Sequence, residues 1–234
     1  MLKGRLKLLY DMIPPCHILS DIGTDHALLP AYALMTGKCK KAIASDINKG
    51  PLERAQCTLM KFGLENSMEL RLGNGLKPIS EDEADCIVIA GMGGHLITEI
   101  LLDSLNVAKR AKNIIIQPMT KQEIVRPFLW RHGFEILDED LVREDNKIYQ
   151  ALRIRYTGVV RENWSHINEV IGEILVKKNN PLVLDWVREH RNRQANVVKG
   201  LMSAKEPDKS LEKESELLKE MELMLKELEN REEP

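Results

Sequence analysis

Over its first two thirds, the chain alternates short apolar runs with amphipathic stretches. Runs such as residues 87–89 and 114–116 are continuously apolar, which is typical of strands covered on both faces. The amphipathic stretches between the runs predict helices, and such alternation predicts a doubly wound, mostly parallel sheet. The predicted strands are 17–22, 41–46, 68–72, 84–90, 112–117, 134–142 and 147–155, and the predicted helices are 28–36, 49–62, 94–105 and 120–132.

No helical pattern separates the last two predicted strands. Only the polar residues 143–147 lie between them, so we expect a hairpin that places an antiparallel strand in the sheet. Pro127 lies inside the fourth predicted helix, where it should kink the helix or delay its start. The first residues of the chain predict a short helix. The fold class expected is therefore α/β, with an antiparallel hairpin at the edge of the sheet.

Strand patterns cease beyond residue 156, and the rest of the chain predicts helices. We expect one domain over residues 1–157 and a helical coiled-coil domain over residues 158–234. These helices are expected to pack on one another within the chain, with dimerisation or partner docking as the alternative. The predicted helices are 162–179, 182–205 and 208–231, with breaks at 179–181 and 206–208, and the predicted coiled-coil seam is Leu211, Leu218, Met221, Leu225 and Leu228.

Charge and cysteine usage narrow the class of protein. The net charge is −2, so no global basic field indicates a nucleic-acid partner. Residues 161–205 nevertheless carry 8 Lys and Arg against 5 Asp and Glu, which makes this segment the candidate phosphate-binding surface. The four cysteines form no CxxC pair, so we expect free thiols in a reducing cytoplasm and no metal site. No run reaches the ~20 apolar residues of a membrane span, and no signal-peptide pattern opens the chain.

The first strand runs into a turn that carries Asp21, Gly23, Asp25 and His26, and the second strand ends in Asp46. A strand, a glycine turn, a helix and a second strand ending in an acid form a nucleotide-binding half-unit. The turn lacks the GxGxxG pattern, and a carboxylate at Asp25 would repel a pyrophosphate. It would suit a sulfonium with an amino-acid tail, so the sequence favours S-adenosylmethionine over NAD.

Three further strand ends carry segments that suit the same ligand. Asn74 and its flanking glycines follow the third strand, where an amide can bind an adenine edge. Three glycines between residues 91 and 94 leave a bare backbone surface, and Gln117 ends the fifth strand. Carboxyl ends of parallel strands face the ligand crevice of such a sheet. Each segment taken alone also fits a structural role, such as a helix cap or a glycine turn.

Taken together, these segments resemble the bacterial tRNA (adenine-N1)-methyltransferase family TrmK, which modifies adenine 22 of tRNA. The resemblance spans about residues 2–156, in the family's order. It implies a class I, Rossmann-like fold that binds S-adenosylmethionine and tRNA. The segments that carry it are DIGTDHALLP (21–30), GPL (50–52), RLGNGL (71–76), IAGMGG (89–94), QP (117–118) and EDNKIY (144–149).

The resemblance and the residues together assign candidate roles. Asp25 is the catalytic candidate, either as acceptor for the exocyclic amine of adenine or as partner of the cofactor's ammonium group. The chain departs from the family at Asn74, where Asp is common, and at Leu28, where Tyr is common. The cofactor-binding candidates are Asp21, Gly23, Asp46, Ile47, Asn74, Gly75, Ala90, Gly91 and Met92, and the substrate-binding candidates are Arg5, Lys7, His26, Gly93, Gly94, Gln117 and Pro118.

The expected reaction is direct attack of adenine N1 on the sulfonium methyl group, after the base has been exposed or flipped. Basic residues of the first predicted helix and of the C-terminal domain are candidates for gripping tRNA, and we expect a monomer or weak dimer. The alternatives are a methyltransferase acting on another RNA, a protein or a small molecule, then a nucleotide-binding oxidoreductase, then a non-enzymatic scaffold. The candidate tRNA-binding cations are Lys3, Arg5, Lys7, Arg188, Arg191 and Arg193.

Overall fold

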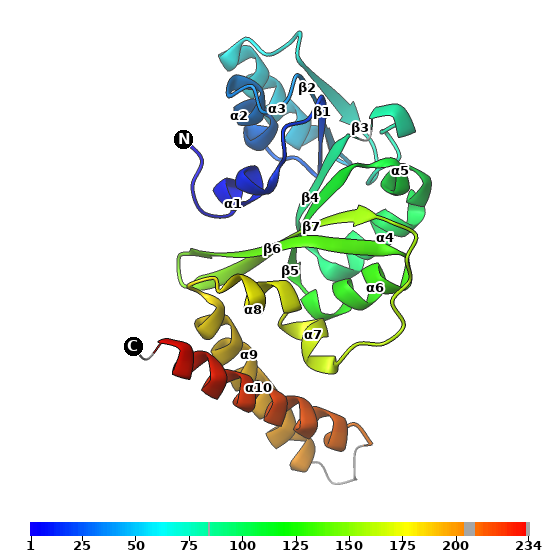
Figure 1. The fold of residues 1–234 in the computed structure, drawn as a ribbon. Helices are drawn as coiled ribbons and strands as arrows, with labels where there is room; N and C mark the ends of the chain where they lie inside the picture. Colours follow the sequence, from blue (N-terminus) through cyan, green and yellow to red (C-terminus); the bar gives the residue numbers. More distant parts are fainter. Residues whose placement is uncertain (84, 204–208, 233–234) are drawn as a thin grey trace. The chain divides into compact units, whose positions relative to one another are not determined.

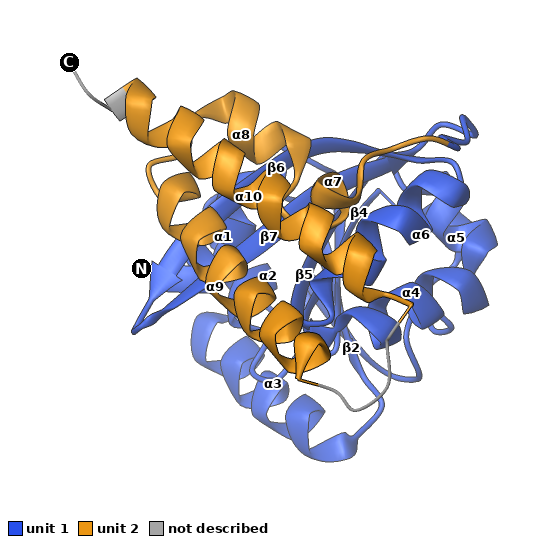
Figure 2. Ribbon diagram, turned by 90° about the horizontal axis from the view of Figure 1, so that it is seen from below, with its two compact units in different colours: residues 1–162 blue, residues 163–234 orange. Residues whose placement is uncertain are grey.

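The structure, a computed structural model, describes residues 1–83, 85–203 and 209–232. The chain forms two compact units, Met1–Glu162 and Asn163–Pro234 (Figure 2). The domain boundary expected from the sequence was residue 157. Some predictions fall outside the described residues. They are residue 84 of the fourth predicted strand, and the helix ends and the break predicted within residues 204–208.

The first unit is built on a seven-stranded sheet with the order β3-β2-β1-β4-β5-β7-β6. Strands β1 to β5 are parallel, and β7 pairs antiparallel with both β5 and β6. The predicted α/β sheet with an antiparallel edge hairpin is therefore confirmed. The strands are β1 (Ile18–Ile22), β2 (Lys41–Asp46), β3 (Met68–Leu72), β4 (Cys86–Gly93), β5 (Asn113–Thr120), β6 (Phe134–Glu144) and β7 (Lys147–Tyr156).

Helices cover both faces of this sheet, and Figure 1 shows α1, α2 and α3 on one side and α4, α5 and α6 on the other. Alternate residues of one strand serve the two faces: Ile87 and Ile89 pack in the core under α4 and α6, whereas Cys86 and Val88 pack in the core under α1 and α2. This explains the continuous apolar runs. The helices are α1 (Gly4–Met12), α2 (Leu28–Met35), α3 (Lys49–Phe62), α4 (Gly94–Asp103), α5 (Leu105–Arg110) and α6 (Val125–Arg131).

The prediction was wrong in detail around the fourth predicted helix. Strand β5 continues to Thr120, a short 3-10 turn follows, and α6 begins only at Val125. Pro127 then lies in the first turn of α6, where its missing N–H would have no helical partner in any case. The delayed start is therefore confirmed. Helix α5 was not predicted as a separate element.

The second unit contains α7 (His166–Val170), α8 (Glu173–Lys178), α9 (Val183–Met202) and α10 (Leu211–Glu232). The single helix predicted over 162–179 is wrong, because Gly172, with φ of 94°, separates α7 from α8.

Helices α9 and α10 pack against each other in antiparallel fashion. The side chain of Gln194 in α9 donates to Glu214, near the start of α10. Arg188, which comes earlier in α9, pairs with Glu229, near the end of α10. The predicted seam needs one correction, because Leu217 is buried and Leu218 is only half-buried. The helix-on-helix packing expected within the chain is therefore observed.

One glycine contact offers a test of the packing between α4 and the β5–α6 connection. A Cβ on Gly94 would lie 2.1 Å from the Lys121 carbonyl oxygen, a backbone atom that cannot move away cheaply. We expect Gly94→Ala to lower the free energy of unfolding by about 1–3 kcal/mol, measured by urea denaturation. Gly200→Ala is the matched control, because no atom lies within 4 Å there. It should raise stability by about 0.5–1 kcal/mol. Equal effects of the two changes would contradict this account.

Candidate functional site

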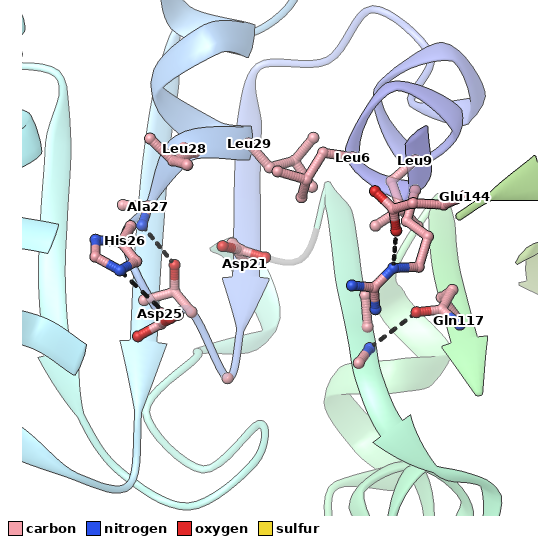
Figure 3. A pocket seen from close by; sticks show the side chains of 15 residues that line it. Leu6, Leu9, Asp21, Asp25, His26, Ala27, Leu28, Leu29, Gln117 and Glu144 are labelled. Atoms are coloured by element: carbon pink, nitrogen blue, oxygen red, sulfur yellow. Dashed lines mark hydrogen bonds and ion pairs between the residues drawn. The ribbon is translucent and has the colours of Figure 1, made fainter. Parts of the chain in front are cut away.

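A pocket of about 440 Å³ opens between the carboxyl ends of β1 and β4, where the strand order reverses. In doubly wound sheets the connections leave such neighbouring strands toward opposite faces, which leaves a crevice for a ligand. Figure 3 shows its side chains converging from β1, α1, α2 and β5. It is lined by Arg5, Leu6, Leu9, Asp21, Gly23, Thr24, Asp25, His26, Ala27, Leu28, Leu29, Ala90, Gly91, Gln117 and Glu144.

The turn after β1 owes its shape to a glycine. Gly23 has φ of 75°, and a Cβ there would lie 2.1 Å from the Met92 methyl carbon. The Gly23 and Thr24 N–H groups donate to the Ser45 carbonyl of β2, at 2.8 and 2.9 Å. The turn is therefore tied to its neighbouring strand, and Met92 of β4 occupies the space that a side chain at Gly23 would need.

Asp21 is the buried acid of the pocket, with 9% of its surface exposed. Burial raises its pKa from the ordinary 3.8 to about 6, and the side-chain hydrogen bond with Thr24 opposes that rise. Among the described residues no cationic side chain pairs with Asp21, and a desolvated carboxylate of this kind is suited to binding a cationic ligand group.

Asp25 differs from Asp21 in exposure and in partners. Its side chain is 65% exposed, and its Oδ1 accepts from two nitrogens of Arg54, with the Nε contact at 2.9 Å. Its Oδ2 lies 3.5 Å from the His26 Nε2. The N-cap of α2 is Ala27, so Asp25 does not cap that helix. Arg54 was missed by the sequence analysis, since it lies 29 residues further on, in α3, with no motif linking it to Asp25.

Gln117 supports the glycine turn at the end of β4. Its side-chain oxygen accepts from the Gly91 N–H at 3.2 Å, and its Nε2 donates to the Pro118 carbonyl at 3.1 Å. Gln117 is only 1% exposed. Gly91 has φ of 78° and open space where a Cβ would lie, so conformation rather than crowding favours glycine there. The amide therefore holds this wall of the pocket in place.

Helix α1 closes the side of the pocket opposite Asp25. The Arg5 Nε donates to Glu144 Oε2 at 2.5 Å, and this pair belongs to the lining (Figure 3). Lys7, predicted alongside Arg5, is not among the lining residues and instead pairs with Asp11 at 2.6 Å. Leucines of α1 and α2, which the sequence analysis did not select, form an apolar wall: Leu6, Leu9, Leu28 and Leu29.

Several predicted site residues lie outside this pocket. Asp46 ends β2, beside β1, and its Oδ1 accepts from the Asn48 N–H at 2.7 Å. Ile47 is 61% exposed. Asn74 and Gly75 line a separate hollow of about 30 Å³ between the end of β3 and α4. All four nevertheless lie at or just after the carboxyl ends of neighbouring parallel strands, which is also the side of the sheet where the pocket opens.

The remaining residues predicted to bind the cofactor or the substrate have places in the fold that do not involve a ligand. Met92 packs over Gly23, Gly93 precedes α4, Gly94 approaches the Lys121 backbone, and Pro118 is buried. Among the predicted tRNA-binding cations of the second unit, Arg188 pairs with Asp185 and Glu229, and Arg193 pairs with Glu189.

The described part of the chain shows neither a metal-ligand cluster nor a candidate membrane span. No group of three or more His, Cys, Asp or Glu side chains is placed to hold a metal ion there. None of the described helices combines the length and hydrophobicity of a membrane span. The four cysteines are free, with Cys39 and Cys86 buried.

Known proteins resemble this chain over nearly its whole length. A family model described as a methyltransferase domain matches residues 2–152. The tRNA (adenine(22)-N(1))-methyltransferase of Bacillus subtilis is 32% identical over 228 residues, which cover 95% of each chain. This chain belongs to the tRNA (adenine(22)-N(1))-methyltransferase family. The resemblance inferred from the sequence motifs is therefore confirmed.

Solved structures of the family agree with the fold. The crystal structure of the B. subtilis m1A22 tRNA methyltransferase TrmK matches with a TM-score of 0.83 and 30% identity, over 97% of this chain and 98% of that one. M. capricolum TrmK in complex with S-adenosylhomocysteine, the natural cofactor product, matches with a TM-score of 0.78 and 26% identity, over 98% of each chain. Both units of this chain therefore have counterparts in the family.

The buried Asp21 predicts a pH dependence of stability. Its pKa is higher in the folded chain than in the unfolded one, so the folded state holds the extra proton between about pH 4 and 6. Its contribution to stability therefore falls as the pH rises through that range and stays low above it. Asp21→Asn removes this dependence. The free energy of unfolding of the variant minus that of the wild type should therefore rise by on the order of 3 kcal/mol from pH 4 to pH 8, measured by urea unfolding. The exposed Asp82→Asn is the control, and a pH-independent difference for Asp21→Asn would contradict the assignment.

Proposed function

We propose that this protein methylates N1 of adenine 22 in tRNA, with S-adenosylmethionine as the methyl donor. The observation that carries the proposal is the 32% identity to the B. subtilis enzyme over 95% of both chains. The pocket at the β1–β4 reversal supports it independently, because it combines a glycine turn, the buried Asp21 and the ion pair between Arg5 and Glu144.

The cofactor is proposed to lie along the carboxyl edge of the sheet. Asp21 would accept from the ammonium of its amino-acid end, and Arg5, the permanent cation among the described lining residues, would meet its carboxylate. Asp46 ends β2 and Ile47 follows it, and these two residues would hold the ribose. Asn74 with Gly75 would contact the adenine ring. Ala90, Gly91 and Met92 would then border the reactive methyl group.

Adenine N1 carries a lone pair in the neutral base, so the reaction needs no covalent enzyme intermediate. N1 attacks the methyl carbon, the N–C bond forms as the S–C bond breaks, and the sulfur keeps the bonding pair as a thioether. Positive charge thereby moves from sulfur to the purine ring. We propose that Asp25 Oδ2 accepts from the exocyclic amine and stabilises that charge, while Arg54 holds Oδ1.

N1 lies on the Watson–Crick edge, so the target adenine must leave any base pair before it enters the pocket. The wall of leucines from α1 and α2 offers apolar surface to a flat base, with Leu28 45% and Leu6 36% exposed. The proposed adenine-binding side of the pocket also contains His26 and Gly91, and the Gln117 side chain holds Gly91 in place. We further propose a monomer or weak dimer, because the apolar residues of α10 pack against α9 within the chain.

Methyl transfer to unmodified tRNA transcripts tests the function directly. With labelled S-adenosylmethionine, nucleoside mass spectrometry should find 1-methyladenosine, and a transcript with guanine at position 22 should accept no label. Methylation of that control transcript would contradict the assigned position. Cofactor binding without transfer to any tRNA would direct the search to another acceptor.

The proposed role of Asp25 predicts a separation of chemistry from binding. Asp25→Asn should lower kcat by about 10–100-fold, since it removes a charge that faces the developing cation, and should leave the Kd for S-adenosylmethionine within twofold. Single-turnover methylation and calorimetry measure the two. Glu53→Gln, an exposed acid beside Arg54 on α3, is the control. An unchanged kcat would remove Asp25 from the reaction, and a weakened Kd would place it on the cofactor.

A further inference from the structure

The ion pair between Arg5 and Glu144 joins residues that are 139 positions apart in the sequence. It differs from a simple surface ion pair because Arg5 has further contacts. Both side chains are about one third exposed. Besides the bond to Glu144, the Arg5 Nη1 lies 3.3 Å from the Met119 sulfur, and the guanidinium carbon lies 4.7 Å from the centre of the Tyr149 ring. Contacts from β5, β6 and β7 therefore fix one side chain of α1.

The backbone beneath this pair is adapted to it. Gly4, the first residue of α1, has φ of 52°, and a Cβ there would lie 2.2 Å from Glu144 Oε1. A side chain at Gly4 would both strain the backbone and displace the carboxylate. Glu144 is thus held with one oxygen against Gly4 and the other on Arg5.

The contacts also decide which Arg5 donors remain available. Glu144 takes the Nε–H and Met119 lies beside Nη1, while the guanidinium lines the pocket that also contains Asp21. A guanidinium has five N–H donors in a fixed plane. Fixing the Nε side therefore leaves terminal donors for a planar, bidentate anion, and a carboxylate has that geometry.

We propose that Glu144 is a positioning residue for the cofactor, which orients Arg5 so that its terminal N–H groups meet the carboxylate of the amino-acid end of S-adenosylmethionine. This inference rests on the proposed function of the pocket. Glu144 itself would not touch the cofactor. Because it acts through the amino-acid end alone, its loss should affect only ligands that carry that end.

Glu144→Gln tests the proposal, because it keeps the size of the side chain and removes its charge. By calorimetry, the Kd for S-adenosylmethionine and for S-adenosylhomocysteine should rise about tenfold, while the Kd for 5′-methylthioadenosine, which lacks the amino acid, should stay within twofold. Asp11→Asn is the matched control, since it breaks the Lys7–Asp11 pair on the same helix, outside the pocket. It should change none of the three values.

A double-mutant cycle tests whether Glu144 acts through Arg5. In an Arg5→Ala background, Glu144→Gln should cause no further loss of affinity for S-adenosylmethionine. Equal weakening of 5′-methylthioadenosine would overturn the proposal in favour of a general packing role. Unchanged cofactor affinity with a raised KM for tRNA would also overturn it and assign the pair to RNA. A wild-type protein that binds no S-adenosylmethionine would instead refute the proposed function.

If Glu144→Gln does not fold, Arg5→Lys is the second variant. It keeps the charge and removes the planar fork, so S-adenosylmethionine should again weaken about tenfold and 5′-methylthioadenosine should not. Full retention of cofactor affinity by Arg5→Lys would overturn the proposal.

Discussion

The reversal of strand order between β1 and β4 is the constraint on which the site depends. Because the two strands are adjacent and parallel, their carboxyl ends meet, while α2 and α4 leave toward opposite faces of the sheet. A crevice must then remain between the two turns. Gly23 and Gly91 lie in those turns with positive φ, and as glycines they add no side chain that would fill the crevice. The backbone geometry therefore places the crevice, and the side chains that line it leave the pocket of about 440 Å³.

Asp21 at the end of β1 and Asp25 in the turn that follows acquire different properties from their surroundings. Asp21 sits at the end of β1, is desolvated and has a raised pKa, so it suits a cationic ligand group held in the pocket. Asp25 lies four residues on, is largely exposed and has one oxygen held by Arg54. Burial therefore separates the carboxylate proposed to bind the cofactor from the one proposed to face the reacting base, although both are aspartates of the same segment.

The wall opposite this turn comes from segments that are distant in sequence. Helix α1 contributes Arg5 and Leu6 near the start of the chain, and Glu144 comes from the end of β6. The antiparallel hairpin of β6 and β7 therefore does more than close the sheet edge. It carries the carboxylate and the Tyr149 ring that hold α1 against the pocket, which links the edge of the sheet to the proposed cofactor site.

The sequence by itself determined the sheet class, the strand-end motifs and the family, because periodicity, glycine turns and local spacing are properties of contiguous residues. It placed Asp21, Gly23 and Gly91 correctly at strand ends. Only the tertiary structure decided the rest. The pairing of Arg54 with Asp25, the bond between Arg5 and Glu144 and the choice of Leu217 over Leu218 depend on packing between distant segments or on helix rotation. A linear pattern contains no direct record of such contacts.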